Sequence, residues 1–215
     1  MAFYNNVIAG ASGAVGGDSA AYQIERSLRF NTADSSTLSR TPASAGNRRT
    51  STISFWIKLT GGGTYGVNPV LEAGFSGSGS SQSGFGIKFT ADQKLQIVEQ
   101  NSNSITWQLQ TTAVYRDYGS WYSFVVALDT TQSTVADRVK VWVNGEQVTS
   151  FSTASYPSPN YESNINKALP HRIGASDSGG TPYLPMSAYL ADVHFIDGQA
   201  LAPTDFGEYD SNNVW

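Results

Sequence analysis

The sequence predicts an all-β protein in which two antiparallel sheets pack face to face, preceded by a short N-terminal arm. Apolar residues alternate with polar ones over most of the chain, turn-rich segments separate these stretches, and no segment keeps an apolar period of 3.6 residues. Strands that follow one another without helical crossovers form antiparallel sheets, and two such sheets bury one side of each strand. We therefore expect a sandwich of about ten to twelve strands.

Residues 1–21 differ in composition from the rest and are predicted to form a flexible arm. Glycines alternate there with alanine and serine, and glycine raises the entropy cost of ordering a chain. The arm also carries a short apolar head, which favours docking onto a partner and consists of Phe3, Tyr4, Val7 and Ile8. The alternative is a frayed end without a role. The β domain then spans residues 22–215.

Strands are expected where the alternation is clearest, at residues 22–30, 53–59, 85–89, 95–97, 105–109, 122–128, 139–143 and 188–196. Asn144-Gly145 predicts a type I′ turn after residues 139–143, with the chain returning through residues 147–151. Turn-rich segments are expected at residues 61–63, 74–84, 101–104 and 176–182. The segment nearest to a helix is residues 202–206, where Pro203 suits a first helical turn.

Composition excludes several classes of function. Charged residues make up 14% of the chain and the formal net charge is −4, which argues against nucleic-acid binding because phosphate neutralisation needs an excess of lysine and arginine. The absence of cysteine excludes disulfides, thiolate zinc sites and cysteine nucleophiles. No export signal and no membrane span are recognised, so we expect folding in a cytoplasm.

Catalytic constellations are not found in the sequence, and no catalytic residue is expected. A glycosidase needs two carboxylates about 5 Å apart, whereas Glu25, Glu72, Glu99 and Asp129 each stand among apolar or neutral residues. The acidic cluster near the chain end, at residues 205–210, falls in an expected loop. No Gly-x-Ser-x-Gly elbow is present, and His194 is expected to face solvent or to make a structural hydrogen bond.

Three motifs in order carry a family resemblance. They are Thr-Ile-Ser-Phe-Trp-Ile-Lys at residues 52–58, Val-Lys-Val-Trp-Val-Asn-Gly at residues 139–145, and Leu-Ala-Asp-Val followed by Asp-Gly-Gln-Ala-Leu within residues 190–201. This order resembles the laminin-G-like branch of the concanavalin A-like jelly rolls over residues 22–215. In detail the chain is similar to versions encoded by tailed bacteriophages, notably marine ones, as virion structural proteins.

The resemblance also bears on metals, because some laminin-G-like domains bind calcium at the rim of the sandwich. Rim candidates here are Asp92, Asp137 and Asp177. None lies in a dense run of oxygen ligands, so each is better explained as a turn former. We expect no metal site and no cofactor, with calcium as the one ion that the resemblance leaves open.

The resemblance implies a non-enzymatic virion protein, a capsid decoration, head fibre or tail appendage. The expected partners are other virion proteins of the capsid or tail and further copies of the same chain, without nucleic acid or membrane insertion. The expected location is the virion, after synthesis in the host cytoplasm. A density map of the assembled particle tests this expectation.

The alternative is a carbohydrate-binding, lectin-like module that adheres to a host-surface glycan. Aromatic rings stack on sugar rings and amides bond hydroxyls, which selects four loop residues: Tyr156, Asn160, Tyr161 and Tyr183. Trp107 and Tyr118 are further aromatic candidates near strand ends, whereas Trp56, Trp121 and Trp142 are expected in the core or on a sheet face. A third hypothesis is a divergent glycan hydrolase.

Overall fold

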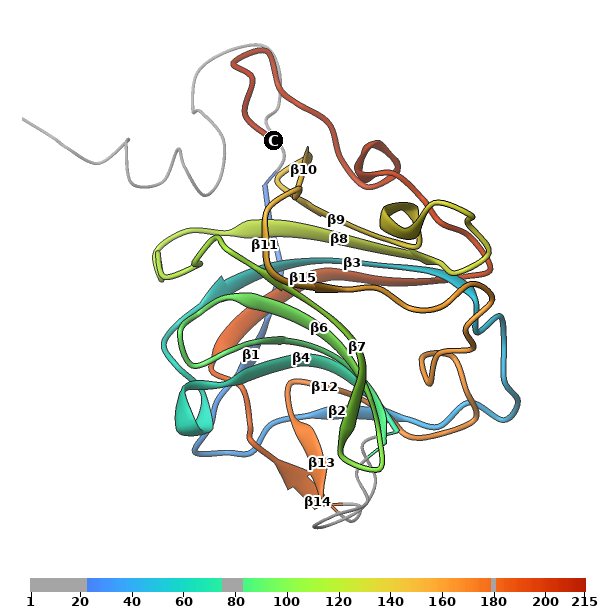
Figure 1. The fold of residues 1–215 in the computed structure, drawn as a ribbon. Helices are drawn as coiled ribbons and strands as arrows, with labels where there is room; N and C mark the ends of the chain where they lie inside the picture. Colours follow the sequence, from blue (N-terminus) through green and yellow to red (C-terminus); the bar gives the residue numbers. More distant parts are fainter. Residues whose placement is uncertain (1–22, 75–82, 179–180) are drawn as a thin grey trace, which may run out of the picture.

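The computed structural model describes residues 23–74, 83–178 and 181–215, which form two antiparallel sheets packed face to face (Figure 1). This architecture confirms the expected all-β sandwich. The predicted arm, including Phe3, Tyr4, Val7 and Ile8, lies outside the described residues.

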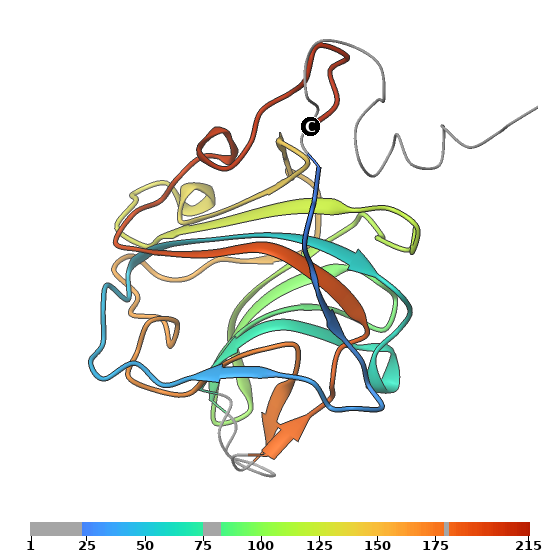
Figure 2. The ribbon, with the colours of Figure 1, turned by 180° about the vertical axis from the view of Figure 1, so that it is seen from behind.

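The first sheet has six strands and contains the long central strands of the molecule. In spatial order these are β1 (Leu28–Phe30), β15 (Ala188–Asp197), β3 (Thr50–Leu59), β8 (Tyr122–Asp129), β9 (Val139–Val143) and β10 (Glu146–Gln147). β3 pairs with β15 on one side and with β8 on the other, so residues from the two ends of the chain meet at the centre of this sheet. Figure 2 shows β1 and β15 from behind.

The second sheet has seven strands. Their order is β11 (Phe151–Ser155), β7 (Ser104–Thr111), β6 (Leu95–Asn101), β5 (Gly84–Phe89), β4 (Asn68–Ala73), β12 (His171–Ile173) and β2 (Leu38–Arg40). A separate hairpin joins β13 (Ser176–Ser178) to β14 (Thr181–Tyr183), and single 3₁₀ turns occur at η1 (Thr64–Gly66), η2 (Val135–Asp137) and η3 (Pro203–Asp205). None of the described helical segments has the length and apolar character needed to cross a membrane.

The core lies between the two sheets and is rich in aromatic rings. Phe124 on β8 is fully buried, with its ring 5.5 Å from Phe55, 5.5 Å from Phe89 and 5.1 Å from Tyr115. Such offset and edge-to-face arrangements match the quadrupoles of the rings. Burial raises the pKa of Tyr115 to about 12, as expected for a phenol inside this layer.

The Asn144-Gly145 turn is confirmed, since both residues have positive φ, at 48° and 82°, and β9 pairs with β10 across it. The predicted return strand ends early, however. β10 stops at Gln147, and the chain then crosses to the other sheet as β11. The 3₁₀ turn η3 forms where Pro203 was expected to begin a helical turn.

Short strands account for most of the differences from the predicted pattern. The described residues form fifteen strands, and β2, β12, β13 and β14 have three residues each. Three residues are too few to display an alternating pattern, so such strands are recognised only by their pairing: β12 with β4 and β2, and β13 with β14. The segment at residues 176–182, expected to be a turn, carries the β13–β14 hairpin.

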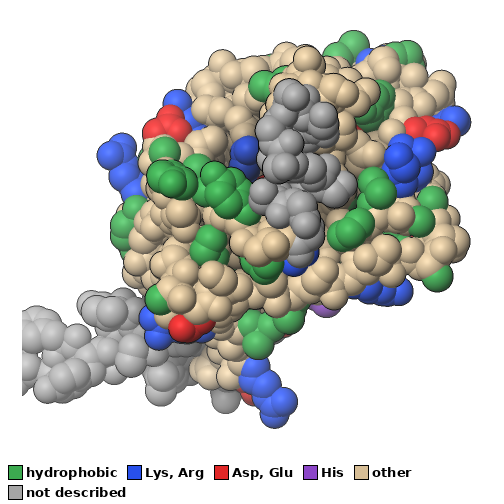
Figure 3. All heavy atoms as spheres, turned by 90° about the horizontal axis from the view of Figure 1, so that it is seen from below, with side chains coloured by type: hydrophobic (Ala, Val, Ile, Leu, Met, Phe, Trp, Pro, Cys, Tyr) green, Lys and Arg blue, Asp and Glu red, His purple; other side chains and the backbone are tan. Residues whose placement is uncertain are grey.

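The surface is dominated by neutral polar groups, as the low content of charged residues predicts. Figure 3 shows one face, on which neutral polar side chains and backbone predominate and charges are scattered. The ion pairs among the described residues include Arg48–Glu162, Arg49–Glu162, Lys94–Asp92 and Lys140–Asp137. All four include a partly exposed partner, so each contributes little to stability.

The aromatic layer should dominate the stability of the fold. Replacing Phe124→Ala removes a fully buried ring that lies against four other aromatic rings, and the free energy of unfolding should fall by about 3–5 kcal/mol. Urea unfolding followed by circular dichroism measures this loss. The control is Tyr118→Ala, since Tyr118 is 42% exposed. A similar loss in the two variants would contradict the assigned core.

Candidate functional site

A buried acid, Glu99, holds the loop that follows β11 against one end of the sandwich. Glu99 lies on β6 with no exposed surface. Its carboxyl accepts hydrogen bonds from the backbone N–H and side-chain amide of Asn164, at 2.8 and 2.7 Å, and from the Ser163 hydroxyl. Burial raises the pKa of Glu99, and these three donors offset part of the effect. The carboxyl cannot reach a substrate, so its role is to close the sandwich.

Three of the four residues predicted to bind sugar lie on this loop. Tyr156 and Tyr161 are partly buried and pack against the core, so they help to seal the end of the sandwich. Asn160 is exposed, has a φ of 59°, and donates its backbone N–H to the carbonyl of Thr130 at 2.7 Å.

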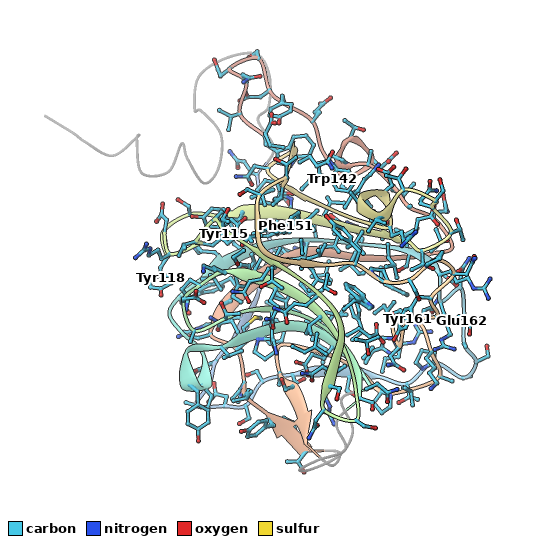
Figure 4. All side chains as sticks on the ribbon, viewed as in Figure 1. Tyr115, Tyr118, Trp142, Phe151, Tyr161 and Glu162 are labelled. Atoms are coloured by element: carbon cyan, nitrogen blue, oxygen red, sulfur yellow. The ribbon has the colours of Figure 1, made fainter. Side chains whose placement is uncertain are left out.

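Tyr183, the fourth predicted residue, lies on β14 and is 45% exposed. The β13–β14 hairpin and the labelled Tyr161 occupy different corners of the sandwich (Figures 1 and 4). The structure therefore does not gather the four residues on one surface.

The other aromatic candidates, Trp107 and Tyr118, do not share a surface with Tyr161. Trp107 is fully buried, so the expectation that it lies near a strand end and contacts a ligand is wrong. It shares the inner face of β7 with Leu109, and its ring lies 6.1 Å from Phe85. Tyr118 is exposed, and Figure 4 shows it on the side of the molecule opposite Tyr161.

Two of the three rim aspartates, Asp92 and Asp137, have protein partners. Asp92 lies 3.0 Å from the Lys94 ammonium, and hydrogen bonds from Thr90 and Lys94 lower its pKa. Asp137 lies 3.1 Å from Lys140. Asp177 falls within β13. Across the described ranges, no cluster of three or more histidine, aspartate or glutamate side chains is placed to hold a metal ion.

A concentration of aromatic and acidic side chains occurs elsewhere, on the outer face of the six-stranded sheet. We call it the aromatic hollow. It has a volume of about 470 Å³ and is lined by Ser54 and Trp56 from β3, Asp192 and His194 from β15, and Thr204, Phe206, Gly207, Glu208 and Trp215 from the C-terminal segment.

Strand alternation places the floor of the aromatic hollow. Phe55 and its inward-facing neighbours on β3 are in the core, so Ser54 and Trp56 point to the opposite face. On β15 a bulge lies between Ala191, which pairs with Trp56, and His194, which pairs with Ser54. Asp192 within this bulge has a φ of 46°. Bulges redirect side chains, and this one adds a carboxylate to the wall of the hollow.

Hydrogen bonds to β3 fix the beginning of the C-terminal segment. The Thr52 hydroxyl donates to the carbonyl of Gln199 at 2.7 Å and accepts the N–H of Leu201 at 2.8 Å. The η3 turn follows, with Pro203 buried and the Ala202 N–H donated to Asp205 at 2.9 Å. Phe206 comes directly after this turn and lies 5.8 Å from the His194 ring.

The β9–β10 hairpin fixes the far end of the same segment. The Tyr209 hydroxyl lies 3.2 Å from the carbonyl oxygen of Asn144 and 3.0 Å from Glu146 Oε1. The Trp215 ring packs edge-on against Tyr209 at 5.0 Å and covers Gly145. Both ends of the segment are thus held by the sheet, which preorganises the rings of Phe206 and Trp215 around the hollow.

A second, larger hollow opens at the edge of the sandwich, and we call it the edge hollow. It measures about 790 Å³ and lies between β2 and β12 of one sheet and the end of β15 in the other. Its walls are largely aliphatic, with Leu38 49% exposed, Phe195 38% exposed, and Arg40 among the polar members. It contains one ring pair, His171 and Phe195 at 6.5 Å, and one carboxylate, Asp197, but none of the described tryptophans lines it.

His171 at the edge hollow is a structural histidine in its neutral form. Its Nδ1 lies 2.8 Å from the carbonyl of Leu169 and donates to it, and its Nε2 accepts the N–H of Asn166 at 3.1 Å. Burial lowers the pKa of His171, and the charge of Arg40 acts in the same direction. A second ring proton would face the Asn166 N–H, so protonation breaks this contact.

Sequence reasoning identified parts of the aromatic hollow but did not join them. Trp56 was expected in the core or on a sheet face, and the acidic cluster with Glu208 was noted in a loop. Trp215 was not singled out. Long-range pairing of β3 with β15, and docking of residues 198–215, bring these groups together, and no local spacing encodes that.

A family model described as the concanavalin A-like lectin/glucanases superfamily (Laminin_G_3) matches residues 30–205. The chain belongs to this superfamily. The match confirms the expected concanavalin A-like, laminin-G-like resemblance and jelly-roll class. The chain matches no curated protein sequence.

Solved structures share the fold of this superfamily member at low identity. The CBM40 module of the Ruminococcus gnavus IT-sialidase has a TM-score of 0.56 and 14% identity, covering 78% of this chain and 95% of the module. The same module has been solved bound to α2,3-sialyllactose. A heptameric pentraxin from Limulus polyphemus has a TM-score of 0.50 and 17% identity, with coverages of 78% and 72%.

A third structure, a variant of the Streptococcus pneumoniae NanB sialidase, has a TM-score of 0.56 and 13% identity, covering 86% of this chain and 27% of the sialidase. These comparisons support the carbohydrate-binding alternative better than the virion role. The virion location, the virion partners and the docking arm stay predictions.

Replacing Gly145→Ala should dislodge Trp215. A Cβ at this position would lie 2.6 Å from the Tyr209 hydroxyl and closer still to the Trp215 ring, and its φ of 82° is unfavourable for alanine. We expect a red shift of tryptophan emission and a stability loss above about 1 kcal/mol. Gly198→Ala is the matched control, because Gly198 has a φ of 77° but a Cβ there would lie 3.9 Å from its nearest neighbour, Asn47. Equal effects in both variants would remove the Trp215 contact as the cause.

Stability should depend on pH through His171. Because its folded pKa is lowered, the unfolded chain binds the proton first, and stability that is complete above about pH 6.5 is lost as the pH falls through the folded value. Urea unfolding between about pH 7.5 and 5.5 measures the loss. His171→Gln should flatten this dependence, whereas His194→Gln, at an exposed position, should leave it intact. An unchanged slope in His171→Gln would contradict the assignment.

Proposed function

We propose that this domain is a non-catalytic carbohydrate-binding module whose ligand occupies the aromatic hollow. The observation that carries the proposal is the grouping of Trp56, Phe206 and Trp215 with Asp192 and Glu208 around one depression. These residues come from three separate parts of the chain and are held by the sheet and its hydrogen bonds.

The chemistry of this lining suits a sugar. Aromatic faces pack against the apolar C–H face of a pyranose ring, and carboxylates accept charge-assisted hydrogen bonds from its hydroxyls. The hydroxyls of Ser54 and Thr204 donate or accept as a sugar requires. A volume of about 470 Å³ lies within the range of small-molecule sites.

Binding is favoured over hydrolysis because of where the two carboxylates lie. Asp192 and Glu208 are both exposed. The catalytic acid of a glycosidase is characteristically enclosed in an apolar pocket, whereas both of these side chains are open to solvent. A reducing-sugar assay on any polysaccharide that binds tests this step, and turnover lost in Glu208→Gln would replace the proposal with the hydrolase hypothesis.

The fold neighbours add support of a general kind. One is a carbohydrate-binding module solved with a sialylated sugar, and the family description names lectins and glucanases. At 14% identity the likeness extends to the fold alone. The residues of the aromatic hollow therefore carry the argument for this chain.

The tryptophans of the aromatic hollow should control affinity. Trp56→Ala and Trp215→Ala should each weaken binding of a glycan selected from an array by at least about tenfold, or ~1.4 kcal/mol, by isothermal titration calorimetry. Trp142→Ala is the matched control, since Trp142 is partly buried on the outer face of the same sheet but does not line the hollow. Binding that survives both hollow variants would disprove the location.

The surface first selected from sequence can be tested in the same experiment. Tyr183→Ala changes an exposed ring outside the hollow, and Tyr161→Ala changes a ring that also packs on the core. Loss of binding in Tyr183→Ala alone would move the site to the β13–β14 hairpin. Display of such a module on a virion, as a homo-oligomer anchored by its arm, is compatible with sugar binding and is tested separately by electron microscopy of particles.

A further inference from the structure

The charge around the aromatic hollow is one-sided. Two carboxylates, Asp192 and Glu208, line it, and among the residues that the structure describes no lysine or arginine does. His194 also lines the hollow, and its ring nitrogens can hydrogen-bond a ligand. A ligand in the hollow therefore meets negative charge and hydrogen-bond acceptors.

Two cations of the same sheet are engaged with aromatic rings. The Lys58 ammonium, two residues beyond Trp56 on β3, lies 5.4 Å from the Trp121 ring and 5.1 Å from the Tyr189 ring. The Arg29 guanidinium also lies over Tyr189, at 5.9 Å. Arg26 lines a neighbouring depression together with Asp192 but does not line the aromatic hollow, so Glu208 is the carboxylate on which the charge argument chiefly depends.

Building on the proposed function, we infer that the aromatic hollow selects neutral, hydroxyl-rich sugars and rejects sugars that carry a carboxylate. A sugar hydroxyl donates to Asp192 or Glu208, whereas a sugar carboxylate brings one acceptor against another. The two negative charges also repel across a few ångströms, well inside the Debye length of about 8 Å at physiological salt, so solution ions screen the repulsion incompletely.

This selectivity departs from that of a fold neighbour. The Ruminococcus module binds sialyllactose, which carries a carboxylate. Here the fold is shared, but the lining residues of the aromatic hollow offer no guanidinium or ammonium to pair with such a group. The inference thus depends on the side chains of this chain and not on its fold.

The test compares a neutral glycan with its acidic counterpart. From an array of neutral and uronate oligosaccharides, a matched pair is chosen that differs in oxidation at C6 only. At about pH 8, where histidine is neutral, the wild-type chain should bind the neutral member at least about tenfold more tightly. Added salt should narrow the ratio, because it screens repulsion of the acid.

Two variants identify the source of the selectivity. Glu208→Gln keeps the shape and removes one charge, so the preference for the neutral member should shrink roughly threefold or more. Glu25→Gln removes the same charge from an exposed position outside the hollow and should leave the ratio unchanged.

The outcomes separate the two proposals. Equal or tighter binding of the acidic member, lost in Trp56→Ala, overturns the inference and leaves the proposed function standing. A neutral preference that Glu208→Gln does not alter also overturns it. Binding to no member of the array, or binding that is insensitive to Trp56→Ala and Trp215→Ala, refutes the proposed function itself.

Discussion

Burial of one aromatic layer between the two sheets determines where every other group in this protein points. Phe55, Phe89, Phe124 and Tyr115 fill the centre of the sandwich, and their contacts leave no freedom in the register of β3 and β8. Since successive side chains on a strand face opposite sides, fixing Phe55 inward fixes Trp56 outward. The floor of the aromatic hollow is therefore a geometric consequence of the core. A shift of β3 by one residue would turn its core side chains outward and its outward side chains, including Trp56, into the core.

Much of the fold follows from the sequence because long strands repeat a simple pattern, whereas most of the site does not. The strand β3 is predicted by the alternation of Ile53, Phe55 and Ile57. The turn between β9 and β10 is predicted by the backbone preferences of Asn144-Gly145. Trp107 shows where prediction from sequence stops. Alternation puts Trp107 on the same face of its strand as Leu109, but the sequence does not reveal which face of a strand the other sheet covers. The bulge at Asp192 could not be predicted either, because an extra residue in a strand is recognised only when the strand is aligned with its partner, here β3.

Membership of a superfamily and ligand preference are separate properties of this chain. The family match and the neighbouring structures concern the sandwich, whose layers many proteins share at low identity. Two buried polar groups likewise stabilise the sandwich. Glu99 holds the backbone of Asn164, and the neutral His171 holds the backbone of Asn166. The proposed recognition instead depends on groups on the outer face of the six-stranded sheet, outside the core between the sheets.

The docking of residues 198–215 on the outer face of the six-stranded sheet has an evolutionary consequence. Five of the nine residues that line the aromatic hollow come from this segment, and four of them, Phe206, Gly207, Glu208 and Trp215, follow the last residue of the family match. Substitutions in this C-terminal segment would therefore change the lining of the proposed site while leaving the sandwich of the family match unchanged. Related chains with nearly identical sheets should then differ in ligand preference wherever this C-terminal segment differs.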